Sequence, residues 1–240
     1  MNIVDDLLPW RDLPIFIDRA EMLAKAMRAK PYDEAKALWR CSDVLAELNC
    51  ERFRTMDVRQ GILTPAIFAY EGIQYQHLAP QVMEAAHLDY LQNHLRILSG
   101  FYGVLRPFDG VVPYRLEMQA KLSVGNAKDL YAYWGDALYR TLAQESEVIV
   151  NLASVEYAKA IVPHAEKAGI LRSVTCLFGS IENGKLVQRS TAAKAARGSM
   201  VRWCAEYKVN CVEDLRAFDV AGYAFDQERS TANCFVFALR

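Results

Sequence analysis

The chain has 240 residues, of which 52% are hydrophobic and 24% are charged, and its 28 Lys and Arg residues against 29 Asp and Glu residues give a formal net charge of -1. This length and composition can bury a substantial core, and they exclude a disordered chain, a collagen-like repeat and a coiled coil. The longest apolar run, residues 234–239, is far shorter than the roughly 20 residues of a membrane helix, and the first residues lack the features of a secretory signal, so we expect a cytoplasmic protein without a membrane partner.

The first part of the chain is predicted to be helical. Apolar residues recur at helical intervals over residues 13–56, which indicates two or three amphipathic helices with a break at Lys30-Pro31. The expected apolar stripes are Phe16, Ala20, Leu23, Ala24 and Met27, followed by Leu38, Cys41, Val44, Leu45 and Leu48. Thr64 then predicts the N-cap of a short helix, and a further helix is expected over residues 82–98.

The second part of the chain is predicted to contain most of the strands. Residues 103–130 are expected to form a loop with short strands, and residues 129–143 a helix. Strands are then expected at 148–154, on both sides of Asn183-Gly184, and in the last twenty residues, with a helix over 192–208. The absence of a regular βαβ alternation favours a single α+β domain over residues 1–240, with a mixed sheet and surrounding helices.

Several common site motifs are absent. The six cysteines contain no C-x-x-C pair and the four histidines show no ligand spacing with them, so we expect core thiols, no metal site and no cofactor. Residues 179–185 match the start of a phosphate-binding loop, but Leu186 stands where that motif needs a Ser or Thr hydroxyl, and the context predicts a β-hairpin.

Residues 94–118 carry the densest set of chemically active side chains. Arginine binds phosphate or carboxylate through two hydrogen bonds, and glycines let a backbone approach a ligand closely. The candidates are Arg96, Ser99, Gly100, Tyr102, Gly103, Arg106, Tyr114, Arg115 and Glu117. A glycine-containing turn after a predicted helix suggests a helix-hairpin-helix element that would hold a DNA phosphate. The alternative is an ion-paired structural loop in which Arg115 and Glu117 bind each other.

A second candidate lies on the predicted helix near residue 189. At about 100° per residue, four positions share an arc of roughly 140°: Lys194, Arg197, Gly198 and Arg202. A glycine among three cations suggests close approach of a phosphate backbone, and the alternative is a solvated basic face with Gly198 packed against a strand. A third cluster, residues 128–136, is either pocket-lining or core.

The sequence resembles the YaaA family of bacterial peroxide stress proteins over nearly its whole length. The segments that carry the resemblance are AIFAYEGIQYQ, HLRILSGFYGVLRPFDGVVPYRLEM, KDLYAYWGD, VIVNLAS-x-EY, AAKAARGSMVRW and the closing F-x-x-x-GY-x-F-D. Family members usually begin with a short strand and the motif S-P-A-K-x-M, whose last position aligns with Met1. We therefore expect an upstream start codon that adds this strand and its lysine.

The resemblance implies a single α+β domain with a basic cleft and a helix-hairpin-helix element, which binds DNA and limits iron-dependent damage under peroxide. It places the hairpin on Ser99, Gly100, Tyr102 and Gly103. It places the cleft cations on Arg96, Arg106, Arg115, Lys128, Lys194, Arg197 and Arg202.

Two main hypotheses follow for the activity. The first is DNA binding, to duplex or distorted DNA without sequence specificity, through phosphate contacts. The alternative is an enzyme that acts on a small anionic or nucleotide-like substrate, with Tyr114 or Glu117 exchanging protons. An iron-handling protein with oxygen ligands ranks last. The basic segments 94–128 and 185–208 hold 11 Lys and Arg against 3 Asp and Glu, so the net charge of -1 does not exclude nucleic acid.

Overall fold

The structure, a computed structural model, describes residues 1–4 and 8–240, and it combines helices with mixed sheets in the α+β class that the sequence predicted. Its contacts divide the chain into two compact units. The first unit comprises Met1–Tyr70, Arg96–Thr141 and Ala153–Pro163, and the second comprises Glu71–Leu95, Leu142–Leu152 and His164–Arg240. Each unit is therefore assembled from segments that are far apart in the sequence, and the assignment of all 240 residues to one domain stays a prediction.

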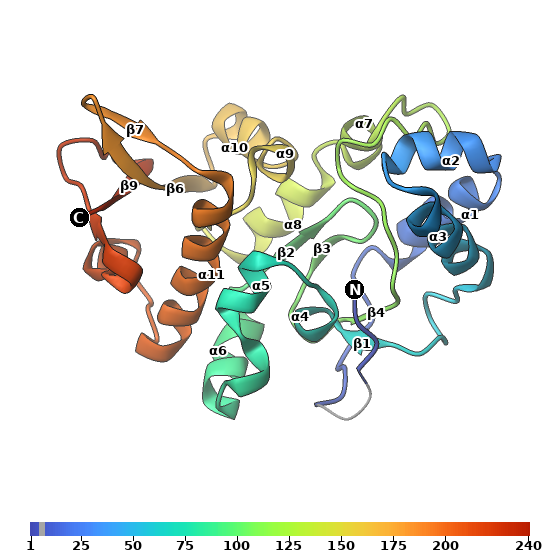
Figure 1. Ribbon diagram of the computed structural model, residues 1–240, viewed down its shortest axis with the longest axis horizontal. Helices are drawn as coiled ribbons and strands as arrows, with labels where there is room; N and C mark the ends of the chain where they lie inside the picture. The colour runs from blue at the N-terminus through green and yellow to red at the C-terminus, as the bar shows by residue number, and fades with distance from the viewer. Residues whose placement is uncertain (5–7) are drawn as a thin grey trace. The chain divides into compact units, whose positions relative to one another are not determined.

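Three helices open the first unit, as the apolar periodicity predicted (Figure 1). They are α1 (Ile17–Arg28), α2 (Tyr32–Trp39) and α3 (Asp43–Thr55). Pro31 separates α1 from α2, because its ring nitrogen cannot donate the main-chain hydrogen bond that would continue α1. The buried face of α1 contains Ala20, Leu23, Ala24 and Met27 of the predicted stripe.

The buried face of α3 differs from the predicted one. Three residues of the expected stripe are exposed: Val44, Leu45 and Leu48. The buried residues are Ala46, Asn49 and Phe53. The ring of Phe53 stacks on Trp39 at a centroid distance of 5.9 Å and meets Phe101 edge to face at 5.6 Å. The prediction for this helix was wrong because one large aromatic side chain determines which face turns inward.

Residues 97–105 form a β-hairpin, which corrects the predicted helix-hairpin-helix element. Helix α6 (Ala85–His94) ends before the predicted Leu98. Strand β2 (Ile97–Ser99) follows and pairs antiparallel with β3 (Gly103–Leu105). Both segments that flank the turn are extended and exchange main-chain hydrogen bonds, so neither can be helical.

Thr64 belongs to a strand and does not cap a helix. Strand β1 (Thr64–Pro65) pairs with β4 (Gly110–Val111), and Pro65 occupies the N-cap position of α4 (Ala66–Ala69). The Thr64 hydroxyl accepts a hydrogen bond from the main-chain N–H of Val4 at 3.1 Å. The predicted helix is therefore present, but strand pairing decides its first residue.

Helix formation over residues 129–143 is interrupted at Gly135. The chain forms α7 (Leu130–Trp134) and α8 (Ala137–Glu145), and Gly135 between them has a φ of 53°. Glycine adopts this left-handed conformation without the steric cost of a Cβ atom. The short helix α9 (Val155–Ala158) follows later in the first unit.

A mixed sheet of five strands forms the centre of the second unit (Figure 1). Its order is β5 (Val148–Asn151), β6 (Arg172–Glu182), β9 (Cys234–Leu239) and β8 (Tyr223–Phe225), with β7 (Lys185–Val187) paired to the end of β6. Strand β6 is parallel to β5 and β9, whereas β8 and β7 are antiparallel to their neighbours. Asn183 and Gly184 have φ values of 50° and 75°, which confirms the predicted hairpin turn.

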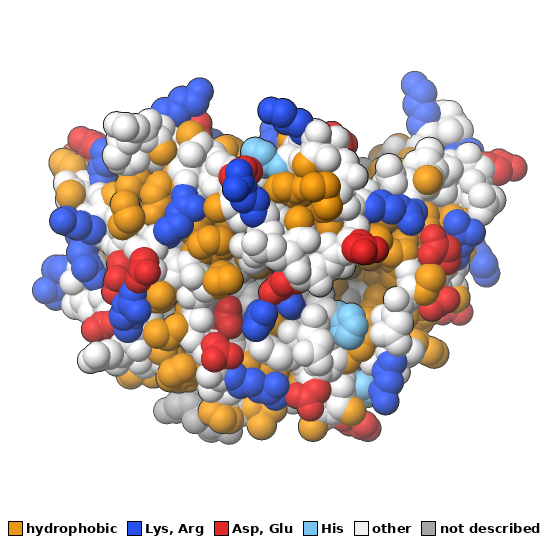
Figure 2. Space-filling model, turned by 180° about the vertical axis from the view of Figure 1, so that it is seen from behind, with side chains coloured by type: hydrophobic (Ala, Val, Ile, Leu, Met, Phe, Trp, Pro, Cys, Tyr) orange, Lys and Arg blue, Asp and Glu red, His pale blue; other side chains and the backbone are white. Residues whose placement is uncertain are grey.

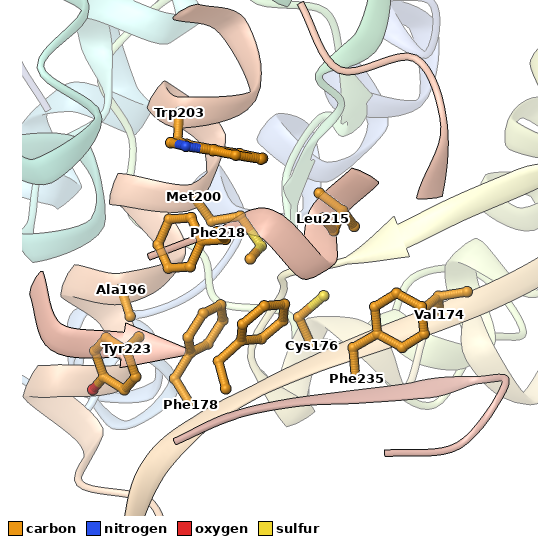
Figure 3. Close-up of a cluster of buried hydrophobic side chains, with 11 residues drawn as sticks. Val174, Cys176, Phe178, Ala196, Met200, Trp203, Leu215, Phe218, Tyr223 and Phe235 are labelled. Atoms are coloured by element: carbon orange, nitrogen blue, oxygen red, sulfur yellow. The ribbon is translucent and has the colours of Figure 1, made fainter. Parts of the chain in front are cut away.

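The sheet packs against α11 (Ser190–Tyr207) to form the core of the second unit (Figure 3). Phe178 of β6 stacks on Phe237 of β9 at 5.2 Å, and Trp203 of α11 meets Phe218 edge to face at 5.7 Å. Of the six cysteines that were predicted to be core thiols, Cys176 is buried, four are partly buried, and Cys211 is exposed, so the prediction was wrong for Cys211. Burial raises the pKa of Cys176 to about 12. The 3₁₀ helix η2 (Val212–Ala217) contributes Leu215 to the same core.

Helix α5 (Ile73–Leu78) packs closely on α11 at Gly198. A Cβ atom at Gly198 would lie 2.0 Å from the main-chain oxygen of Gln74 and 3.1 Å from the Cβ of His77. Gly198 is therefore in contact with a helix backbone, and neither a phosphate nor a strand occupies that position. The remaining elements of this unit are α10 (Val162–Ala168) and the 3₁₀ helices η1 (Pro80–Val82) and η3 (Val220–Gly222).

None of the helices formed by the described residues is long and apolar enough to span a bilayer.

The packing at Gly198 predicts a large loss of stability in Gly198→Ala. The added methyl group has to displace the backbone of α5, so we expect the free energy of unfolding to fall by about 2–4 kcal/mol in urea denaturation. The control is Ser199→Ala, at a neighbouring position of α11 that is not fully buried, which should change it by less than about 0.5 kcal/mol. Equal stability of Gly198→Ala and the wild type would contradict the close packing of α5 on α11.

Candidate functional site

The turn between β2 and β3 uses its main-chain N–H groups inside the protein. The Ser99 Oγ accepts hydrogen bonds from the N–H groups of Phe101 at 3.1 Å and Tyr102 at 2.8 Å. A Cβ atom at Gly100 would lie 2.6 Å from the main-chain oxygen of Leu116. The N–H groups that were expected to hold a phosphate are therefore already satisfied in a buried turn.

The other two residues of this turn are also buried. Tyr102 is fully buried, and its hydroxyl accepts a hydrogen bond from the N–H of Val112 at 3.2 Å. Gly103 has a φ of 78°, and a Cβ atom there would lie 2.8 Å from the Leu138 side chain. These positions support the fold, and their burial disfavours the DNA contact that the resemblance implied.

A chain of buried hydroxyl groups links this turn to two tyrosines. The Tyr114 hydroxyl lies 2.5 Å from the Ser99 Oγ and 2.5 Å from the Tyr70 hydroxyl. Burial raises the pKa of Tyr70 to about 12 and that of Tyr114 far above its ordinary value. Both side chains keep their protons at neutral pH, which disfavours Tyr114 as a catalytic base and makes it a hydrogen-bonding group.

Asp109 is a buried carboxyl group beside two of the predicted cations. It is 4% exposed, and its Oδ2 accepts a hydrogen bond from the main-chain N–H of Arg106 at 2.9 Å. Burial raises its pKa to about 6, and the nearby charge of Asp12 adds to this effect, whereas Arg106 and Arg96 oppose it. Arg106 is exposed and Arg96 is half-buried. The two arginines therefore border a carboxyl group that titrates close to neutral pH.

Arg115 and Glu117 form an ion pair, which agrees with the structural alternative for this segment. Their charged groups are 3.1 Å apart, and the Arg115 guanidinium also donates to the main-chain oxygen of Trp39. The Gln119 side chain donates to Glu117 at 3.3 Å, while its main-chain N–H donates to Glu156 at 3.1 Å. Gln119 thus connects two carboxylates.

Glu156 is a candidate that the sequence analysis did not identify. Burial raises its pKa, and the charge of Glu117 acts in the same direction. It lies on α9, shortly after the end of β5, and polar residues after a buried strand are a signal that could have found it. Its partner Gln119 is 37 residues away in the sequence, so local spacing could not reveal the pair.

A cavity of about 290 Å³ in the first unit is bordered by Glu117 and Gln119. Its cationic lining residues are Lys30, Arg40 and Lys121. Lys30 forms an ion pair with Glu34 at 2.8 Å, so the lining carries both charges.

Lys128 is exposed on the loop before α7. The neighbouring Asp129 caps α7, because its Oδ1 accepts a hydrogen bond from the N–H of Ala132 at 2.8 Å. Trp134 is 1% exposed and donates to the main-chain oxygen of Gly100 at 3.0 Å. Trp134 therefore belongs to the core, as the structural alternative for residues 128–136 proposed, whereas Tyr131 is half-buried and Lys128 is exposed.

The predicted cations of α11 have three different environments. Lys194 is exposed, whereas Arg202 forms an ion pair with Glu206 at 2.7 Å. Arg197 is partly buried, and its Nε has no hydrogen-bond partner among the described residues. Burial lowers the pKa of its guanidinium, and the nearby Cys176 opposes this shift. Helix α5 contacts the arc at Gly198, and at about 100° per residue Arg197 and Arg202 lie at its two ends.

The seven predicted cations are divided between the two units. Arg96, Arg106, Arg115 and Lys128 belong to the first, whereas Lys194, Arg197 and Arg202 belong to the second. On the face drawn in Figure 2, Lys and Arg side chains are interspersed with Asp and Glu side chains. One basic cleft that gathers all seven residues stays a prediction.

Within the part of the chain that the structure describes, no group of three or more His, Cys, Asp or Glu residues is arranged to hold a metal ion.

Comparison with known proteins identifies similar chains. Residues 4–229 match a family model described as peroxide stress protein YaaA. The chain is 50% identical over 237 residues to a UPF0246 protein of Lactiplantibacillus plantarum, covering 99% of this chain and 94% of that protein. It is 46% identical to a UPF0246 protein of Desulfitobacterium hafniense, over 99% of this chain and 93% of the relative, and 43% identical to one of Limosilactobacillus reuteri, over 100% and 95%.

The burial of Asp109 predicts a pH-dependent stability that Asp109→Asn removes. The folded protein holds this proton up to a pH of about 6, against 3.8 for an ordinary aspartate, so the contribution of this group to folding is full below pH 3.8 and is lost as the pH rises through 6. Asn cannot ionise, so Asp109→Asn should gain about 1–3 kcal/mol relative to the wild type between acidic and neutral pH, measured by urea unfolding. The exposed Asp33→Asn is the control, and a pH-independent difference for Asp109→Asn would contradict the assignment.

Proposed function

The chain belongs to the YaaA family of peroxide stress proteins, and from this premise we propose that it acts in the cytoplasm by binding DNA through phosphate contacts. Such binding depends on lysine and arginine side chains that neutralise phosphates, and it is insensitive to base sequence. Duplex or distorted DNA is therefore the proposed partner.

The observation that carries this proposal is the state of two cations on the N-terminal half of α11. Lys194 is exposed, and it forms no ion pair with any described residue. Arg197, one turn later, has a buried Nε without a hydrogen-bond partner in the described part of the chain. An unsatisfied guanidinium costs free energy, and an anion such as a phosphate would supply the missing acceptor.

This binding would also limit iron-dependent damage. A protein that neutralises phosphates displaces the cations condensed on DNA. If the displaced cations include iron, the reaction of iron with peroxide occurs farther from the bases. Protection then requires DNA binding and does not require an iron site in the protein.

A second candidate function is catalysis on a small anionic or nucleotide-like substrate. The observation that favours it is the carboxylate pair of Glu117 and Glu156, which Gln119 connects beside the cavity of about 290 Å³. Two carboxylates with different environments can act as acid and base. In this proposal Arg115 holds Glu117, and Glu156, whose pKa is raised by burial, is the candidate proton donor.

Salt dependence and one charge reversal test the DNA proposal. Affinity for unrelated duplexes should fall steeply with salt, and Lys194→Glu should weaken binding to all of them and reduce the slope of log K against log salt by about one. The control is Lys167→Glu, an exposed lysine of α10 in the same unit, which should behave as the wild type. Binding that does not depend on salt, or equal effects of the two variants in fluorescence anisotropy, would rule the proposal out.

A further inference from the structure

The C-terminal end of α11 borders a cavity of about 330 Å³ that the proposed function does not use. Its volume is at the low end of the roughly 300–1,000 Å³ of known ligand sites, which suits a single small molecule or one nucleobase. The side chains that line it and enter the argument are Trp203, Tyr207, Lys208, Asn210 and Asp214.

An aromatic surface forms one wall of this cavity. Tyr207 is 69% exposed, and its ring lies 5.1 Å from that of Trp203 at an interplanar angle of 33°. Trp203 is itself 7% exposed and is held edge to face by Phe218 at 5.7 Å. The exposed tyrosine ring therefore rests on a buried, well-packed support, which is the geometry on which a planar ligand stacks.

The main chain around the cavity is fixed before any ligand binds. The N–H of Val209 donates to the oxygen of Cys204 at 3.0 Å, and its own oxygen accepts from the Tyr90 hydroxyl at 2.6 Å. At the lining residue Asp214, the main-chain N–H donates to the oxygen of Cys211 at 3.2 Å, and the next residue, Leu215, is buried. A site with ordered walls binds with a smaller loss of conformational entropy.

Three polar side chains complete the lining. Lys208, Asn210 and Asp214 are exposed, and in the described residues their side chains form no hydrogen bond or ion pair. Lysine only donates, an ionised aspartate only accepts, and asparagine does both. Guanine matches this set, because its ring N–H and amino group offer adjacent donors to a carboxylate, while O6 and N7 accept from lysine and asparagine.

We propose that this cavity is a guanine-binding site, in which the base stacks on Tyr207, Asp214 accepts from its donor edge, and Lys208 and Asn210 contact its acceptors. The guanine can belong to a free nucleotide or to an unpaired base of a nucleic acid, since both present the same edge and ring. The site lies at the opposite end of α11 from Lys194, so it can be present or absent independently of the proposed DNA binding.

The test uses guanosine 5′-monophosphate with the full chain, and binding is followed by calorimetry and by intrinsic tryptophan fluorescence, to which Trp203 contributes as one of four tryptophans. We expect guanosine monophosphate to bind more tightly than adenosine monophosphate, and Tyr207→Ala to weaken its binding about tenfold while Tyr207→Phe retains it. Asp214→Asn should remove the preference for guanosine over adenosine monophosphate. Tyr32→Ala, at a partly exposed tyrosine of α2, and Lys167→Glu, at the exposed lysine of α10, are the controls and should leave nucleotide binding unchanged.

A single-stranded octamer that contains guanine, compared with one that lacks it, distinguishes the two sources of the base. Binding of the octamer that depends on Tyr207, without binding of the monophosphate, assigns the site to an unpaired base in a nucleic acid. If neither probe binds the wild type at up to about 10 mM monophosphate, or if Tyr207→Ala binds both as the wild type does, the inference is wrong. Duplex affinity that depends on Lys194, together with no binding of either guanine probe, would overturn this inference and leave the proposed function intact.

Discussion

The close packing of α5 on α11 at Gly198 determines which side chains of α11 can meet a ligand. A helix backbone that approaches this closely covers the part of the basic arc around Gly198, between Lys194 and Arg202. Arg197 is left partly buried beside the core, Arg202 turns to Glu206, and Lys194 reaches solvent one turn before the contact. Ala196, Met200 and Trp203 of α11 also pack in the core with the sheet, which fixes Trp203 and therefore the aromatic surface at the C-terminal end of the helix.

In the first unit, burial likewise determines which of the predicted groups can meet a ligand. The Ser99 hydroxyl satisfies the turn between β2 and β3 from within, and Tyr114 and Tyr70 extend this interaction through hydroxyl groups that keep their protons. This segment was expected to offer main-chain N–H groups to a ligand. Instead, its polar groups form hydrogen bonds with one another inside the protein. The groups that remain accessible for chemistry are Arg106 beside Asp109 and the carboxylates that Gln119 connects.

Local sequence was sufficient where a structure depends on neighbours in the chain. The helical periodicity of α1, the break at Pro31, and the turn at Asn183-Gly184 were predicted because backbone conformation and short-range hydrogen bonds decide them. The prediction was wrong for the exposed residues of α3 and for the end of α6. In these places the aromatic contacts of Phe53 and the pairing of β2 with β3 outweigh local preference.

The sequence by itself determined the α+β class, the family and the residue types available for binding anions, because composition, periodicity and long ordered motifs are properties of the chain. Only the tertiary structure decided which of those residues are exposed. In the sequence, Gly198 stands among cations and Gly100 stands in a predicted turn, and both suggested the approach of a ligand. In the structure, another segment of the protein backbone lies within about 3 Å of each position and leaves no room for a Cβ atom. Glu156 became a candidate because folding brings Gln119 into contact with it, and Tyr207 because its ring lies beside that of Trp203.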